Sequence, residues 1–117
     1  MAKKLKIYKD FQNEELYKAK SINDLILLSI YLIDSKKEKC TFEKLVNECF
    51  TLFPRELSFS SLKQWPDSRK LDRPLRDMRR KSLINGNPQS FFTLTKSGKK
   101  YAEEIALSFK QKRILFP

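Results

Sequence analysis

Residues 67–82 read DSRKLDRPLRDMRRKS, and this segment is the most informative part of the sequence. Placed on an α-helix at about 100° per residue, its least polar side is made of Leu71, Leu75, Met78 and Ser82. The roughly opposite side is made of Arg69, Arg73, Arg76 and Arg80. The segment therefore predicts a helix with one apolar and one cationic face. Because Pro74 lacks an amide hydrogen, the regular helix should either start near Asp72 or kink there.

Upstream of this segment, a buried helix is expected from residue 21. Ser21 and Asp24 fit a capping box in which Asp replaces the usual Glu. The following run from Leu25 to Ile33, LILLSIYLI, is apolar on nearly every side, which places it in the middle of the core. A buried strand is the competing interpretation, but the cap and the leucines favour a helix. A charged turn, DSKKEK, follows at 34–39.

A second helix is expected to begin after Thr41 and to end at Pro54. Its buried face should consist of apolar residues at helical spacing: Phe42, Leu45, Val46, Cys49, Phe50 and Phe53. Residues 55–66 then resemble a loop, in which Phe59, Leu62 and Trp65 should act as anchors to the body. Trp65 could instead offer a platform for stacking bases, which is the less favoured interpretation.

Downstream, residues 83–95 predict a hairpin around Gly86, with Phe92 and Leu94 on one side and Thr93 and Thr95 on the other. Thr95 can cap a last helix over about 96–112, whose apolar positions are Tyr101, Ala102, Ile105 and Phe109. Gly86 and Gly98 fit a turn and close helix packing. A further helix over 11–20 is plausible from its composition, and the apolar tail 114–117 should dock on the protein.

Size and charge suggest one domain with a polyanionic partner. The chain has 117 residues, 40% of them hydrophobic, and a net charge of +11 from 25 basic and 14 acidic residues. Nucleic acid is the commonest polyanion for such a protein, although lysines that only improve solubility are the alternative. We expect a basic, helical N-terminal extension at 1–20 and one domain at 21–117.

The inventory of reactive residues argues against an enzyme or a metal protein. There is no histidine, and the two cysteines, Cys40 and Cys49, lie nine positions apart, which excludes Cys/His zinc fingers and His-dependent catalysis. Glu103 and Glu104 are adjacent and point apart on a helix. Pro66-Asp67 could open a nuclease site of the PD-(D/E)xK type, but no acidic-x-Lys triad follows it at a suitable spacing. We therefore expect no catalytic residue, no metal and no cofactor.

Compartment and redox state follow from similar observations. The cysteines fit reduced core residues of a cytoplasmic protein. The longest apolar run, 25–33, is about half of the roughly 20 residues that a membrane span needs. Acidic residues at 10, 14 and 15 interrupt any signal-peptide pattern, so no membrane association is expected.

The expected order is helix, helix, loop, basic helix, hairpin and helix. Residues 71–84, LDRPLRDMRRKSLI, resemble the recognition helix and first wing strand of the winged-helix superfamily, in the manner of MarR-like and PadR-like regulators. Residues 92–98, FTLTKSG, resemble the strand and turn after the wing. The resemblance covers about 21–110. It implies a mainly α fold with a small β-hairpin, a winged helix-turn-helix with extra N-terminal and C-terminal helical segments.

In that superfamily the helix before the wing lies in the major groove, and the wing touches the neighbouring backbone or minor groove. Carried over to this chain, the resemblance implies double-stranded DNA as partner and the following contacts: Arg69, Lys70, Arg73, Arg76, Arg80, Asn87, Gln89 and Ser90. Two or three of the arginines should only position the helix on phosphates. Two features depart from the pattern: the loop before the basic helix is about a dozen residues long, and the wing tip 85–90 has no Lys or Arg.

The alternative interpretation of the arginines is a solvated helix face with local ion pairs to Asp67, Asp72 and Asp77. The leading hypothesis is a DNA-binding transcriptional regulator that contacts duplex DNA through the Arg-rich helix 68–82 and forms a homodimer through residues 7–20 and 102–116. Its rivals are a winged helix used for protein interaction and an accessory module of a larger restriction or phage-defence assembly.

Overall fold

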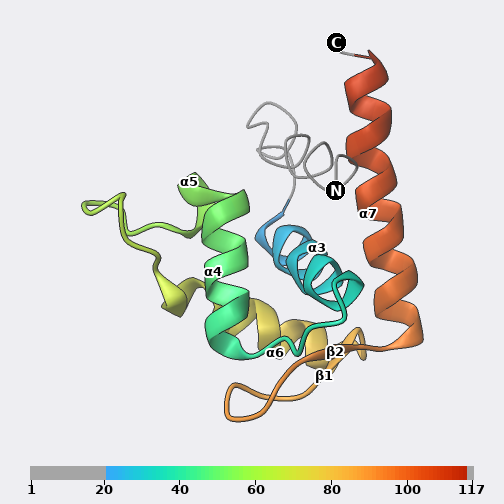
Figure 1. Cartoon of the computed structure of the whole chain (residues 1–117), viewed down its shortest axis with the longest axis horizontal. Helices are drawn as coiled ribbons and strands as arrows, with labels where there is room; N and C mark the ends of the chain where they lie inside the picture. The colour runs from blue at the N-terminus through green and yellow to red at the C-terminus, as the bar shows by residue number, and fades with distance from the viewer. Residues whose placement is uncertain (1–20, 116–117) are drawn as a thin grey trace.

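The computed structural model of the chain describes the backbone of residues 21–115 and the side chains of residues 21–109 (Figure 1). The helix expected at 11–20, the N-terminal extension and the docking of the tail lie outside these residues. In the described part, helices surround a central helix and a short hairpin lies at one end.

The central helix is α3, Ile22–Ser35. The amide of Asp24 donates to the Ser21 hydroxyl at 3.2 Å, so the predicted N-cap is confirmed. The Asp24 carboxylate accepts a hydrogen bond from Tyr101 at 3.1 Å, which links this end of α3 to the last helix. Apart from Tyr31, every side chain from 25 to 33 is buried, so the helical interpretation of this run is correct. Helices α4, α6 and α7 and strand β2 all pack against α3.

The next helix, α4, spans Phe42–Leu52, and the Thr41 hydroxyl accepts from the Lys44 amide at 3.3 Å as a cap. The residues of its predicted inner face differ in burial. Three are fully buried, namely Leu45, Cys49 and Phe53, and three are half-buried, namely Phe42, Val46 and Phe50.

Pro54 ends α4 as expected, but the assignment of 55–66 to a loop from its first residue is wrong. Pro54 opens a short helix, α5, Pro54–Leu57. A proline fits the first position of a helix because that amide has no partner within the helix in any case. The remaining loop is closed by an antiparallel bridge between Ser58 and Pro66.

The basic segment has two parts, a 3-10 turn η1, Ser68–Leu71, and a helix α6, Asp72–Arg80. The regular helix starts at Asp72, which leaves Pro74 in the first turn, where no helical hydrogen bond is lost. Leu71, Leu75 and Met78 are buried as predicted. Ser82 is exposed and has a φ of 58°, because the helix has already ended, so its assignment to the inner face is wrong.

The predicted hairpin is present, with strands β1, Ile84–Asn85, and β2, Thr93–Leu94. They pair antiparallel, Ile84 with Leu94 and Asn85 with Thr93. Phe92 is buried and Thr93 exposed, in agreement with the expected alternation. A third segment lies beside the hairpin, since the Phe92 amide donates to the Cys40 carbonyl at 2.8 Å.

The last helix, α7, spans Lys96–Leu115, longer than predicted. The Gly98 amide donates to the Thr95 hydroxyl at 3.0 Å, so Thr95 is the N-cap. A side chain at position 98 would collide with the Leu83 carbonyl, which explains the glycine by close packing. Ala102, Ile105 and Phe109 are buried, and α7 packs along α3.

The described residues thus form a mainly helical protein with a small two-stranded antiparallel sheet. Within the same residues, no helix has both the length and the apolar character to cross a membrane.

Candidate nucleic-acid interface

The outer face of α6 carries a row of exposed arginines, Arg73, Arg76 and Arg80. They span about 60° of the helix circumference at about 100° per residue. Leu75 and Met78 on the other side are only 2% and 1% exposed, so the helix cannot turn this face inward without unpacking the core. The structure therefore fixes the row on the surface.

Local ion pairs do not occupy this row. Within the described residues, neither Asp72 nor Asp77 forms an ion pair or hydrogen bond with the three arginines. Of the local ion pairs considered in the alternative interpretation, the one between Arg69 and Asp67 is present, whereas the guanidinium groups of Arg73, Arg76 and Arg80 are exposed and form none among the described residues.

Arg69, the first arginine of the predicted stripe, is partly engaged. Its Nε lies 3.0 Å from Oδ1 of Asp67 and its Nη2 lies 3.3 Å from Oδ2. The guanidinium also sits over the Phe59 ring, 5.3 Å from the centroid. The hydrogen bond from Arg69 lowers the pKa of the Asp67 carboxyl below its ordinary value. The Arg69 side chain nevertheless remains 77% exposed, so one edge of it faces solvent.

Lys70 has a structural role that the sequence did not indicate. Its Nζ donates to the Ser58 carbonyl at 2.8 Å and lies 3.4 Å from the Glu56 carbonyl. The side chain is half-buried and ties η1 to the end of α5. A lysine among arginines gives no sign of this role, because its acceptors are backbone atoms 12 and 14 positions away.

Arg79 lies outside the predicted stripe and connects α6 to the hairpin. Its Nη1 donates to the Gly86 carbonyl at 3.1 Å, at the start of the turn between the strands. Gly86 has a φ of 109°, a conformation that side chains rarely adopt, so the turn depends on a glycine there. This bond holds the hairpin in a set position relative to the arginine row.

The three polar residues expected at the wing tip are brought together, but with different freedom. Oδ1 of Asn87 accepts from the amides of Gln89 and Ser90 at 2.9 and 3.1 Å, so it shapes the turn. The Ser90 hydroxyl lies 3.4 Å from the Asn87 carbonyl. Gln89 is exposed, and no side-chain bond of it occurs among the described residues. Gln89 is therefore the tip residue best able to contact a ligand.

The loop at 58–66 does not anchor itself as predicted. Leu62 is 51% and Trp65 58% exposed, so their assignment as core anchors is wrong. Only Phe59 is half-buried, under the Arg69 guanidinium. The loop is closed by backbone bonds across its base, and these replace the expected apolar anchors.

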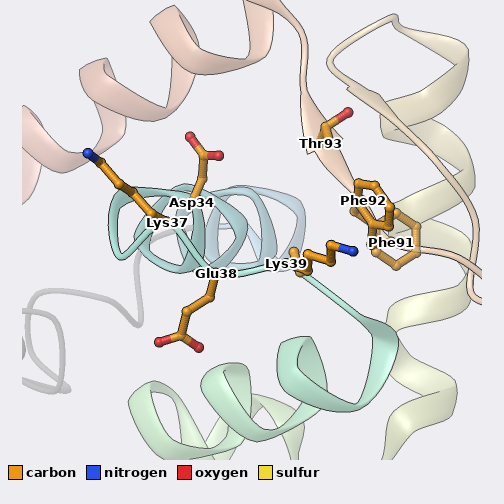
Figure 2. A pocket seen from close by; sticks show the side chains of 8 residues that line it. Asp34, Lys37, Glu38, Lys39, Phe91, Phe92 and Thr93 are labelled. Atoms are coloured by element: carbon orange, nitrogen blue, oxygen red, sulfur yellow. The ribbon is translucent and has the colours of Figure 1, made fainter.

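A shallow pocket of about 480 Å³ lies between the turn after α3 and residues 91–93, which lead into β2 (Figure 2). Lys39 lies over the Phe91 ring, 5.5 Å from its centroid, while Asp34, Lys37 and Glu38 point in different directions. Burial raises the pKa of the Cys40 thiol at the pocket's base to about 12, so the thiol stays protonated at neutral pH and is a poor nucleophile. These side chains do not converge on a common point where a substrate could react.

Cys40 and Cys49 are free thiols and both are buried, as expected. Among the described residues, no three acidic or cysteine side chains come close enough to hold a metal ion. The described apolar residues of the predicted dimer segment, Ala102, Ile105 and Phe109, face this chain's own core, whereas Leu107 is 54% exposed.

No protein-family model matches the chain, and neither a curated protein nor a solved structure is significantly similar to it.

Proposed function

We propose that the protein binds duplex DNA through the exposed arginines of α6, in the manner of a winged-helix transcriptional regulator. The observation that carries the proposal is the row Arg73, Arg76 and Arg80, exposed and without partners among the described residues, on a helix whose other side is locked into the core. Such a row is a set of cationic donors on a helix face that the core holds at the surface.

Arginine suits a duplex for a geometric reason. Its planar guanidinium can donate two parallel hydrogen bonds to a phosphate or to O6 and N7 of guanine. Because the row lies on one helix, its side chains are spaced along a line that can follow a groove. A net charge of +11 adds a long-range attraction to the polyanion.

The surroundings of α6 support the same mode of binding. The bond from Arg79 to Gly86 links the start of the turn in the hairpin to α6, and we expect the exposed Gln89 in this turn to add a polar contact to a bound duplex. The antiparallel bridge between Cys40 and Phe92 adds a short third edge to the hairpin. Lys70 is not part of the proposed interface, because its ammonium group donates to a backbone carbonyl of the chain. Arg69 would contact the duplex only through its exposed edge, because its other edge is paired with Asp67.

The test is a comparison of two doubly substituted variants on a mixed-sequence duplex of about 20 base pairs. Arg73→Ala with Arg76→Ala should weaken binding at least about tenfold, because two phosphate or base contacts are lost. The melting temperature should stay nearly the same, since both side chains are exposed.

The matched control is Lys99→Ala with Lys100→Ala, which removes the same charge from exposed positions on α7. The control should retain most of the affinity. If both variants lose affinity equally, the protein binds through net charge and the assignment to α6 is wrong. If the wild-type protein does not bind the duplex, DNA binding itself is wrong, and a winged helix used for protein interaction takes its place.

Sequence preference separates a regulator from an accessory module. A regulator should select one family of sequences from a random duplex pool and bind it at least about a thousandfold more tightly than random duplex at fixed salt. Equal affinity for selected and random duplex would contradict regulation and favour a module with little sequence choice.

A further inference from the structure

Loop 58–66 holds two large apolar side chains in solvent. Leu62 and Trp65 are 51% and 58% exposed, and they lie three positions apart in the same short loop. In Figure 1 the loop extends away from the helices, on the side of α4 opposite to α7. A contiguous patch of exposed apolar side chains can mark a contact with another molecule.

The loop is ordered enough to present these side chains. Ser58 and Pro66 form an antiparallel bridge, the Phe59 amide donates to the Trp65 carbonyl at 3.1 Å, and the Trp65 amide donates to the Leu62 carbonyl at 3.0 Å. The Asp67 amide bonds to the Leu57 carbonyl at 2.6 Å. These bonds close the base of the loop and hold the backbone of Trp65 in place.

The same base is attached to η1, the turn that leads into α6. Lys70 donates to the Ser58 carbonyl and Arg69 covers Phe59. Eight positions separate Trp65 from Arg73, and residues 68–71 form a compact 3-10 turn. The Cα atoms of Trp65 and Arg73 therefore lie within about 20 Å of each other, given rises of about 3.6, 2.0 and 1.5 Å per residue for extended, 3-10 and α backbone. At about 3.4 Å per base pair, that is the length of roughly six base pairs.

The charge around the tip favours a nucleic acid as the occupant. Between 58 and 66 the only charged residue is Lys63, and the next exposed cation is Arg69. Of the acidic residues next to this stretch, Asp67 is paired with Arg69, which reduces its repulsion of phosphates.

We infer that loop 58–66 is a second contact with the nucleic acid bound by α6, in which Trp65 stacks on an unpaired base. The ligand class is then a duplex that carries a few unpaired nucleotides, such as a gap or an overhang. A paired base is covered on both faces by its neighbours and exposing it costs a few kcal/mol, whereas an unpaired base offers its face directly. The inference rests on the proposed function and adds a preference to it.

The experiment uses Trp65 itself as the probe, because it is the only tryptophan in the chain. Its fluorescence is recorded during titration with a duplex of about 20 base pairs containing a gap of about three nucleotides, and with the fully paired duplex. Affinities are measured in parallel by anisotropy of labelled DNA. Wild-type protein should bind the gapped DNA at least about fivefold more tightly, with stronger quenching, since stacking on one base contributes about 1–3 kcal/mol.

Three variants assign the preference to stacking. Trp65→Ala should lose the preference for the gap, and Trp65→Phe should keep most of it because the aromatic face remains. Leu107→Ala, an equally exposed apolar residue on α7, should behave as wild type. The melting temperatures should remain close to that of wild type, since both side chains are exposed.

The outcomes separate this inference from the proposed function. If gapped and paired DNA bind equally and Trp65→Ala changes neither affinity, the inference is wrong, while the loss caused by Arg73→Ala with Arg76→Ala would still support duplex binding. If Trp65→Ala weakens both DNAs equally, the loop touches the paired backbone and the stacking role is wrong. If neither DNA binds, both claims fail and a protein partner accounts for the exposed loop.

Discussion

The two halves of the basic segment contain the same kinds of residue and use them differently. In η1, Arg69 is paired with Asp67, and Lys70 is bound to backbone carbonyls of the preceding loop. In α6, Arg73, Arg76 and Arg80 have no partner among the described residues. A cationic stretch in a sequence can therefore contain both internal links and open ligand contacts.

The cause of the difference is the local supply of acceptors. The loop at 58–66 leaves carbonyl oxygens at 56 and 58 without helix partners, and they face η1. In α6 the backbone carbonyls accept within the helix or, in its last turn, from residues 81–83, and Arg73, Arg76 and Arg80 are exposed. Lys70 therefore donates to backbone acceptors within its reach, whereas Arg73, Arg76 and Arg80 have no partner among the described residues.

The largest effect should come from the inner side of α6. Leu75→Ala should lower the free energy of unfolding by about 2–5 kcal/mol, because Leu75 is 2% exposed and its loss leaves a cavity. Denaturant unfolding followed by circular dichroism measures this change. Arg76→Ala, at the next position and on the outer side, should change the free energy of unfolding by less than about 0.5 kcal/mol. Comparable losses from both would mean that the two sides of α6 are not inner and outer.

An intermediate effect should come from Lys70. Lys70→Met keeps the aliphatic length but leaves the carbonyls of Ser58 and Glu56 without their donor, so the free energy of unfolding should fall by about 1 kcal/mol. Lys70→Met and Lys99→Ala each remove one positive charge. Their affinities for the mixed-sequence duplex should therefore differ by less than about twofold. A large loss of affinity with unchanged stability would place Lys70 with the open row.

The smallest effect concerns the pair between Asp67 and Arg69. The hydrogen bond from the Arg69 side chain lowers the pKa of Asp67. A lowered pKa in the folded state means that the pair stabilises the protein above the ordinary Asp pKa and that this contribution is lost as the pH falls through the lowered pKa. Arg69→Ala should therefore raise the pKa of Asp67 toward its ordinary value, as followed by NMR titration of the carboxyl carbon.

Part of the shift should remain in Arg69→Ala, because the backbone amide of residue 69 also donates to Asp67 at 3.2 Å. Arg76→Ala is the control and should leave the pKa of Asp67 unchanged. An unchanged pKa in Arg69→Ala would show that the pair does not form in solution.

The features that sequence reasoning found are those determined by near neighbours. The caps at Ser21, Thr41 and Thr95 depend on residues three positions away, and the buried side of α6 follows from helical spacing. The same spacing located Arg73, Arg76 and Arg80 on the opposite side. Local periodicity was therefore sufficient for α3, α4, α6, α7, the hairpin and the exposed row, but not for the four-residue helix α5.

The features that it missed depend on atoms far apart in the chain. Lys70 and Arg79 donate to backbone carbonyls whose positions are set only by folding. No pattern of side chains in the sequence therefore predicts these two hydrogen bonds. Trp65 was expected inside because a large aromatic residue usually is, but its loop is closed by backbone bonds and gives it no cavity to fill. The exposure of Trp65 can be recognised only from the three-dimensional arrangement of the loop.

The central claim is that the α6 row binds phosphates or base edges of a duplex, and the salt dependence of binding tests it most directly. For wild type, the logarithm of the association constant should fall linearly with the logarithm of salt concentration, with a slope of about −0.9 per phosphate contact. In Arg73→Ala with Arg76→Ala the slope should become shallower by up to about 1.8 if both arginines contact phosphates. An identical slope and affinity in the two proteins would contradict the claim.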